Sequence, residues 1–259
     1  MSVKACFSIT SIVVILVVSC VQRSDRDQLI IAAASSTKHA LDSLKANFTA
    51  TTGIECQITY GSSGIVASQI INGAPFDIFL SANSSYSDTI LNLGLALDTP
   101  RIYATGSLVI WSPGREIDSI EIEDAIMEAE KIAIPNPEIA PYGNAAREYL
   151  RSIRIWEDCQ PRIVIGESVS HATHFLGSGA APLGFTALSL IKGKDGIDPG
   201  HWFVVDPKTH ISLDQTIVLI DHKDRSSIAA KRFREFLLSE EGEEILYHFG
   251  YGSPRVGLF

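Results

Sequence analysis

Short apolar runs alternate with helical patterns along most of this sequence, and this alternation constrains the fold more than any other feature. Between several of the runs, apolar residues recur three and four positions apart, as Leu41, Leu44 and Phe48 do before Gly53. Such alternation predicts βαβ units, with helices covering both faces of parallel-rich sheets. The predicted strands are residues 29–34, 56–60, 77–82, 107–111, 131–135, 162–167, 183–188 and 216–220. A helical pattern closes the chain over 227–249, with Gly242 as its candidate break.

The predicted elements divide into two lobes. The chain has 259 residues, of which 46% are hydrophobic, and this is enough apolar material for a core in each lobe. We find no flexible linker; instead, the extended apolar runs 103–112 and 211–220 bracket the middle of the chain. We therefore expect one lobe from residues 28–108 plus 213–259 and the other from residues 109–212. The two bracketing runs would be crossover strands that act as a hinge.

The N-terminal segment has the pattern of an export signal. Residues 1–20, MSVKACFSITSIVVILVVSC, contain Lys4, an apolar stretch and a final Ser-Cys pair. The stretch is shorter than the roughly 20 residues that a transmembrane helix needs. Its end is similar to a bacterial lipobox, which predicts lipidation of Cys20 and a membrane anchor; the alternative is an ordinary signal peptide cut nearby. Residues 21–27 would be a polar tether.

Charge and cysteine content exclude several other classes. The net charge of −9 gives no sign of a nucleic-acid-binding surface, although it leaves room for a small anionic ligand held by local dipoles. Outside the signal only Cys56 and Cys159 remain, so we predict unpaired cysteines and no disulfide framework. His171 and His174 lie three residues apart with no evident third ligand, so we expect surface histidines and no metal site.

Small and hydroxyl residues follow four of the predicted strands. They are Ser35-Ser36, Gly-Ser-Ser-Gly at 61–64, Ala-Pro-Tyr-Gly at 140–143 and Ser-Val-Ser at 168–170. Each junction opens a helix, where unpaired N–H groups and the helix dipole attract anions. A single junction of this kind is explained as a helix cap. Four of them, two in each expected lobe, favour a ligand site at the carboxyl ends of the strands.

The character of these junctions also limits the ligand. They offer donors, and none supplies a convincing acceptor; Glu167 is the nearest carboxylate. A fully deprotonated dianion accepts hydrogen bonds from every direction, whereas a protonated phosphate needs an acceptor in its site. The rival hypothesis is an exported serine hydrolase, which would need a base within reach of Ser36 or Ser63.

Five stretches carry a family resemblance: LIIAAASS, YGSSGIVASQIINGAPFDIFLSA, IAIPNPEIAPYGNAA, PLGFTALS and YHFGYGSP. Together they resemble the periplasmic molybdate-binding proteins of ABC importers, which have a type II periplasmic-binding-protein fold. The resemblance implies a non-enzymatic, exported and monomeric solute-binding protein without a cofactor. Its ligand would be molybdate or tungstate, with sulfate as the alternative oxyanion, and its partners would be an ABC permease and its ATPase.

The same resemblance assigns the oxyanion ligands. It implies hydroxyl and backbone donors from Ser35, Ser36 and Ser63, and the backbone N–H groups of Tyr142 and Val169. Two positions depart from the family pattern. Asn83 stands where the family usually has Asp, and Ala187 stands where some members place a tyrosine, so we expect that tyrosine contact to be absent.

Overall fold

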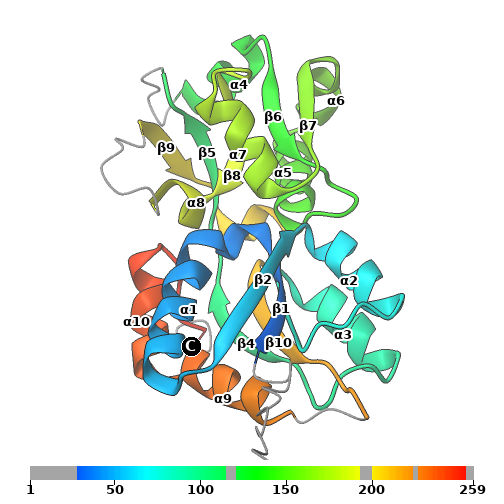
Figure 1. Cartoon of the computed structure of the whole chain (residues 1–259). Coiled ribbons are helices and arrows are strands. Elements are labelled where there is room, and N and C mark those ends of the chain that lie inside the picture. Colours follow the sequence, from blue (N-terminus) through cyan, green and yellow to red (C-terminus); the bar gives the residue numbers. More distant parts are fainter. Residues whose placement is uncertain (1–27, 115–120, 193–199, 224–226, 255–259) are drawn as a thin grey trace, which may run out of the picture.

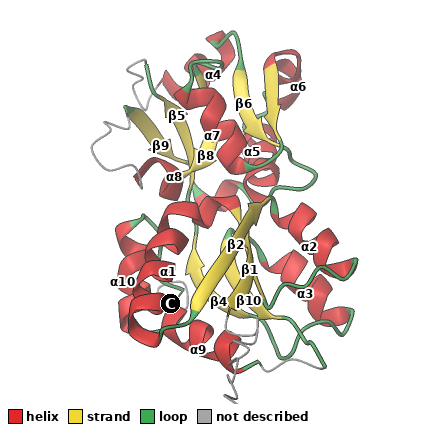
Figure 2. Ribbon diagram, in the orientation of Figure 1, coloured by secondary structure: helices red, strands yellow, loops and turns green. Residues whose placement is uncertain are grey.

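The computed structural model describes residues 28–114, 121–192, 200–223 and 227–254. These residues form two lobes, each built on one five-stranded sheet (Figure 1). In each lobe, helices flank the sheet (Figure 2). The predicted two-lobed α/β fold is thus confirmed. Within the described residues, none of the helices combines the length and the apolar character needed to cross a membrane.

The first lobe contains the sheet β2-β1-β3-β10-β4. Strand β1 pairs in parallel with β2 and β3, whereas β10 runs antiparallel to β3 and β4. The strands are β1 Gln28–Ala34, β2 Glu55–Gly61, β3 Ile78–Ser81, β4 Arg101–Thr105 and β10 Asp214–Leu219. The helices are α1 Lys38–Thr52, α2 Ser63–Ile71, α3 Ser84–Asn92, α9 Ile228–Leu237 and α10 Glu240–His248.

The second lobe contains the sheet β7-β6-β8-β5-β9. Strand β6 pairs in parallel with β7 and β8, and β5 pairs antiparallel with β8 and β9. The strands are β5 Leu108–Ser112, β6 Ile132–Pro135, β7 Ile163–Gly166, β8 Leu183–Ala187 and β9 His201–Val204. The helices are α4 Ile122–Glu128, α5 Pro141–Ser152, α6 Trp156–Cys159, α7 Val169–Gly177 and α8 Leu188–Lys192. Short 3₁₀ helices cover Ser35–Thr37, Gln160–Arg162 and Pro207–Thr209.

Strand β1 shows how the sequence pattern builds the first lobe. Its residues alternate between the faces of the sheet, so that Ile31 packs with α1 and α9, while Ala32 packs with α2. On the α1 side, the rings of Phe48 and Phe233 meet edge to face with centroids 5.1 Å apart. Helices α1, α9 and α10 lie on one side of this sheet and α2 and α3 on the other (Figure 1). Both faces of the sheet are therefore buried, as the alternation predicts.

The lobes are joined at two places. Strand β4 ends at Thr105 in the first sheet, and β5 begins at Leu108 in the second. The chain returns between β9 and β10, where Gly106 N–H of the first connection donates to the Leu213 carbonyl. The apolar run 103–112 is thus two strands of two sheets, separated by Gly106 and Ser107. We propose residues 28–108 plus 213–259 and residues 109–212 as the lobes.

Several sequence-based expectations need correction or lie outside the described residues. Strand β9 was not among the predicted strands, and β4 was predicted only from residue 103, as part of a single crossover strand at 103–112. The closing helical pattern breaks at 238–239 and not at Gly242, because the Ser239 hydroxyl oxygen accepts the Gly242 N–H at 3.2 Å and so caps α10. The predicted signal at 1–20, Cys20 and the tether at 21–27 lie outside the described residues.

The two cysteines of the described residues are free and buried, as predicted. Burial raises the pKa of the Cys56 thiol to about 11 and also raises the pKa of Cys159. Both cysteines are therefore small core residues that stay protonated at neutral pH.

Candidate functional site

All four predicted junctions meet at one cavity between the lobes. The five expected ligand residues, Ser35, Ser36, Ser63, Tyr142 and Val169, line it together. The remaining lining residues are small or apolar, apart from Ser62: Ala34, Gly61, Ala82, Ala140 and Pro141. Residues far apart in the sequence thus come together because parallel strands in both lobes end at the facing edges of their sheets.

The first junction follows β1. Ser35 and Ser36 lie in a 3₁₀ turn that precedes α1, and the Thr37 hydroxyl donates to the Ala34 carbonyl at 2.7 Å. Both serines are buried. The Ser36 hydroxyl is an unpartnered buried group and lies at the cavity. Because an unpartnered buried hydroxyl costs free energy, its position suits a ligand that accepts a hydrogen bond.

The second junction follows β2 and holds Ser62 and Ser63 at the N-terminus of α2. Ser63 Oγ accepts the Ala82 N–H at 3.1 Å, so its own proton is available to donate elsewhere. The Ser62 hydroxyl is buried without a partner and also lines the cavity. Ser63 was predicted as a ligand residue, whereas Ser62 was not. The available signal was its place as the N-cap residue, next to Ser63 in the Gly-Ser-Ser-Gly turn.

The third and fourth junctions present backbone donors. In the first turn of α5, Gly143 and Asn144 both donate their N–H groups to the Ala140 carbonyl. Pro141 has no N–H group. The N–H group of Tyr142 is therefore the one in this turn that does not donate to that carbonyl. In α7, the N–H of Ser170 goes to Ser35 Oγ at 3.3 Å and that of His171 to Ser168 Oγ at 3.3 Å. The N–H group of Val169 donates to neither of these two serine oxygens.

The side chain of Tyr142 lies at the hinge between the lobes, and its hydroxyl is buried without a hydrogen-bond partner. Its phenol lies against Gly106, in the first connection between the lobes, so closely that a side chain at Gly106 would overlap it. Burial raises the pKa of the Tyr142 phenol well above its usual value, so it stays neutral. Tyr142 thus brings its N–H group to the cavity, and its buried phenol adds a further hydroxyl without a partner beside the hinge.

The cavity is small and carries no charged side chain among its described lining residues. The centre of a water-sized sphere can occupy about 10 Å³ of the cavity, and about 180 Å³ in the cavity and its mouth is free of protein atoms. Organic ligands usually occupy pockets of about 300 Å³ or more. The site therefore suits a compact ligand of a few atoms that accepts hydrogen bonds from helix N-termini and hydroxyls.

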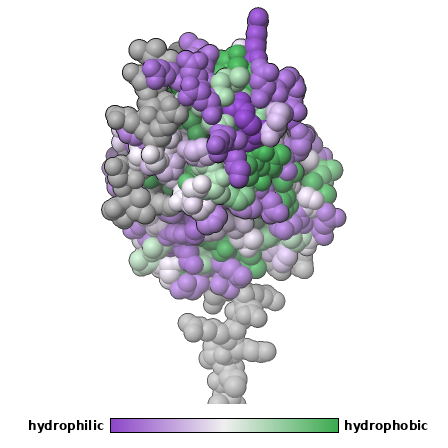
Figure 3. Space-filling model, turned by 90° about the horizontal axis from the view of Figure 1, so that it is seen from above, coloured by the Kyte–Doolittle hydropathy of each residue, from purple (hydrophilic) through white to green (hydrophobic). Residues whose placement is uncertain are grey.

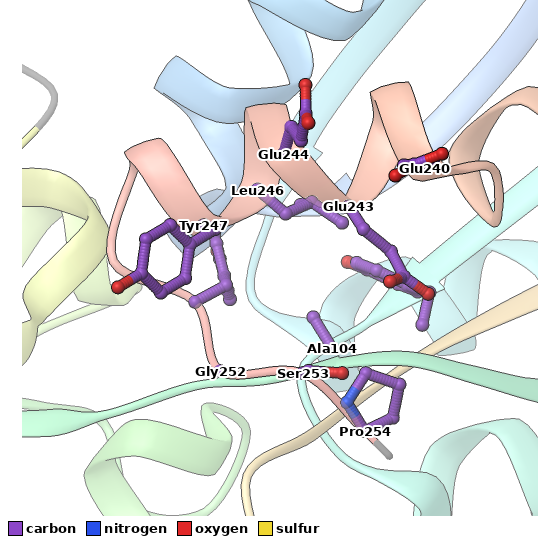
Figure 4. A pocket seen from close by; sticks show the side chains of 11 residues that line it. Ala104, Glu240, Glu243, Glu244, Leu246, Tyr247, Gly252, Ser253 and Pro254 are labelled. Atoms are coloured by element: carbon purple, nitrogen blue, oxygen red, sulfur yellow. The ribbon is translucent and has the colours of Figure 1, made fainter. Parts of the chain in front are cut away.

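A larger hollow lies elsewhere, on the first lobe between α10, β4 and the segment that follows α10 (Figure 4). Its volume is about 270 Å³ on the measure that gives about 10 Å³ for the interlobe cavity, and it is lined by Glu240, Glu243 and Glu244 together with tyrosines. None of the five expected ligand residues lines it. Three carboxylates would repel an anion, so the interlobe cavity is the better candidate although it is smaller.

The remaining candidate residues do not form a site. His171 and His174 are exposed, and the ring of His171 packs on Phe175 with centroids 4.5 Å apart. Across the described ranges, no three or more His, Cys, Asp or Glu side chains are grouped so that they could hold a metal ion. Ala187 is buried at the end of β8.

Seen from above, the outer face of the second lobe mixes hydrophilic surface with smaller hydrophobic patches (Figure 3).

The molecule has two sheets joined by two connections, and polar helix termini from both lobes surround one small cavity. This arrangement defines a two-lobed binding protein. Residues 29–252 match the family of bacterial extracellular solute-binding proteins. The chain belongs to this family.

Particular relatives narrow the comparison. The chain is 34% identical to the molybdate-binding protein ModA of Rhodobacter capsulatus over 86% of this chain and 88% of the relative. Its structure is similar to the periplasmic molybdate-binding protein of Azotobacter vinelandii, with a TM-score of 0.81, 32% identity, and coverage of 87% of this chain and 99% of that one. It is also similar to the substrate-binding domain of a putative molybdenum ABC transporter from Clostridium difficile, with a TM-score of 0.63, 28% identity, and coverage of 87% and 98%.

Proposed function

We propose that this protein captures molybdate or tungstate between its lobes and delivers the anion to an ABC permease with its ATPase. The observation that carries the proposal is the cavity in which donors from four helix N-termini converge, with no charged side chain among the lining residues that the structure describes. The names of the relatives support molybdate as the ligand. The proposed ligand groups are the hydroxyl and backbone donors of Ser35, Ser36 and Ser63, and the N–H groups of Tyr142 and Val169.

Magnitudes support this assignment. A hydrogen bond to a charged group contributes about 1.5–3 kcal/mol net. Five to seven such donors, after the cost of ordering the ligand and the lobes, would support a dissociation constant of about a micromolar or lower, which corresponds to roughly −8 kcal/mol. The unpartnered hydroxyls of Ser36 and Ser62 add to this, because an anion would satisfy groups that otherwise remain buried without a partner.

We also propose that the protein is not an enzyme. A serine nucleophile needs a base within hydrogen-bond reach, and no His, Asp, Glu or Lys is among the described residues that line the cavity. We further propose an exported monomer, lipid-anchored through Cys20, whose place in the membrane brings it to the permease.

Titration calorimetry of the mature protein with molybdate, tungstate, sulfate and phosphate tests the proposal. We expect strong binding of the first two anions, weaker binding of sulfate, and no binding of phosphate near neutral pH, because monohydrogen phosphate would place a proton against a donor-only site. Tighter binding of sulfate than of molybdate would reassign the ligand, and an absence of binding for all four anions would refute the oxyanion function.

A further inference from the structure

The carbonyl groups of Ser35 and Ser36 are held from the other lobe, although these serines belong to the first lobe. The Ser170 hydroxyl of α7 donates to the Ser35 carbonyl at 2.9 Å. The Ser189 hydroxyl of α8 donates to the Ser36 carbonyl at 2.8 Å, a buried contact between residues 153 positions apart. Both donors come from helices of the second lobe. Ser35 and Ser36 thus line the cavity and are also hydrogen-bonded, through their carbonyl groups, to the second lobe.

We infer that Ser170 and Ser189 form a latch that holds the lobes closed through the backbone of the anion loop, Ser35–Ser36. The inference rests on the proposed function and deepens it by naming residues that position the site without touching the ligand. An anion that fixes Ser35 and Ser36 also fixes their carbonyls in the place where the latch hydroxyls reach them. Ligand binding and lobe closure would therefore stabilise each other through the same two residues.

Tyr251 supplies a natural comparison within the same contact. Its hydroxyl also donates to the Ser36 carbonyl, at 2.9 Å, but it belongs to the first lobe. This tyrosine follows α10, and the adjoining residue Gly252 exchanges hydrogen bonds with Thr105 of β4. The Ser36 carbonyl thus accepts one hydroxyl from each lobe. Removing either donor leaves this carbonyl with one hydroxyl partner, and only Ser189→Ala removes the hydroxyl that the second lobe contributes to it.

The test compares Ser189→Ala and Ser170→Ala with Tyr251→Phe, each of which removes only a hydroxyl. Stopped-flow tryptophan fluorescence would give the release rate of molybdate. We expect release to become about two- to tenfold faster in each serine variant, which is the range that one neutral hydrogen bond supplies, and the effects to multiply in the double variant. Tyr251→Phe should change the release rate less, since both partners of its hydrogen bond move with the first lobe.

A second readout does not need the ligand. Small-angle scattering of the molybdate-free protein should show a larger radius of gyration for the double serine variant than for the unmodified protein. Equal effects of Ser189→Ala and Tyr251→Phe on release would mean that the contacts only stiffen the loop, and would overturn the latch. An unchanged release rate together with an unchanged radius of gyration in the double serine variant would also overturn the latch. Failure of the unmodified protein to bind molybdate in calorimetry would refute the proposed function separately, and the scattering comparison would still decide the latch.

Discussion

Replacing Gly64 by alanine should separate folding from ligand capture. Gly64 lies in the first turn of α2, and its N–H donates to the Ile139 carbonyl of the second lobe at 2.9 Å. A Cβ atom built at this position would lie 2.9 Å from the same carbonyl oxygen and 2.8 Å from the Tyr86 hydroxyl. The tyrosine side chain can move aside, but the Ile139 backbone can retreat only if the lobes separate. The added methyl group therefore conflicts with the closed arrangement and not with the fold of either lobe.

The expected magnitude follows from that contact. Overpacking typically costs about 1–3 kcal/mol. If this cost falls only on the closed form, the dissociation constant for molybdate should rise by roughly five- to 150-fold. The ligand-free protein should keep its melting temperature or gain slightly, because alanine is a better helix residue than glycine by about 0.5–1 kcal/mol. Calorimetry would measure the affinity, and thermal unfolding with and without molybdate would measure the stability.

A matched control lies in the same helix. Ser68→Ala places an alanine at an exposed position of α2 and leaves the interlobe contact unchanged. We expect this variant to bind molybdate as the unmodified protein does. If Gly64→Ala also binds with unchanged affinity, the close approach of α2 to Ile139 does not belong to the ligand-bound form. A large drop in the melting temperature of the ligand-free Gly64→Ala protein would show instead that the contact is part of the fold.

Three further perturbations test other parts of the site and chain. Ser63→Ala should weaken molybdate binding by about 1–3 kcal/mol in calorimetry, since it removes a donor to a charged ligand; unchanged affinity would show that Ser63 is no ligand. Cys20→Ser should move the protein out of the membrane fraction or leave it unprocessed, whereas a native N-terminus without acyl chains in mass spectrometry would leave ordinary export. Burial raises the pKa of Tyr251 to about 12 from its usual 10.0, so the unfolded chain loses this proton first as the pH rises. The free energy of unfolding should therefore fall between pH 10 and 12 in denaturant titrations, and Tyr251→Phe should reduce that fall.

The sequence predicts local structure and the meeting of the four junctions, because both follow from short-range pattern. Hydrophobic periodicity places β1 and α1, and the rule that ligands bind at the carboxyl ends of parallel strands brings Ser36 and Val169 to one cavity. Strand β9 was missed because its pattern is short: Trp202 and Phe203 are only half-buried, at the edge of the sheet. The sequence pattern alone allows the closing helix to break at Ser239 or at Gly242. The structure breaks it at Ser239, because the Ser239 side chain caps the N-terminus of α10.

Contacts that depend on the placement of both lobes had no signal in the sequence. The link between Ser189 and the Ser36 carbonyl joins residues 153 positions apart, and no periodicity or motif marks either serine for it. Gly64 belongs to the Gly-Ser-Ser-Gly junction at 61–64, which the sequence marks only as part of an anion site. The structure adds a different role, because its close neighbour is the Ile139 carbonyl across the cleft. Local pattern identifies the groups that line a site, whereas lobe closure sets their distances.

A cavity of neutral donors has consequences for capture and release. A buried lysine or arginine would bind an anion strongly, but it would leave an uncompensated charge whenever the cavity was empty. Helix N-termini avoid this cost, since their N–H groups are oriented by the helices whether or not a ligand is present. The empty protein can therefore exist without a large penalty, and the bound anion is held by many modest contacts. If the proposed ligand groups are right, opening the lobes would break contacts from α5 and α7 together, and affinity would depend steeply on closure. A permease that favours the open arrangement would then need to supply only the differential free energy between the two forms in order to release the anion.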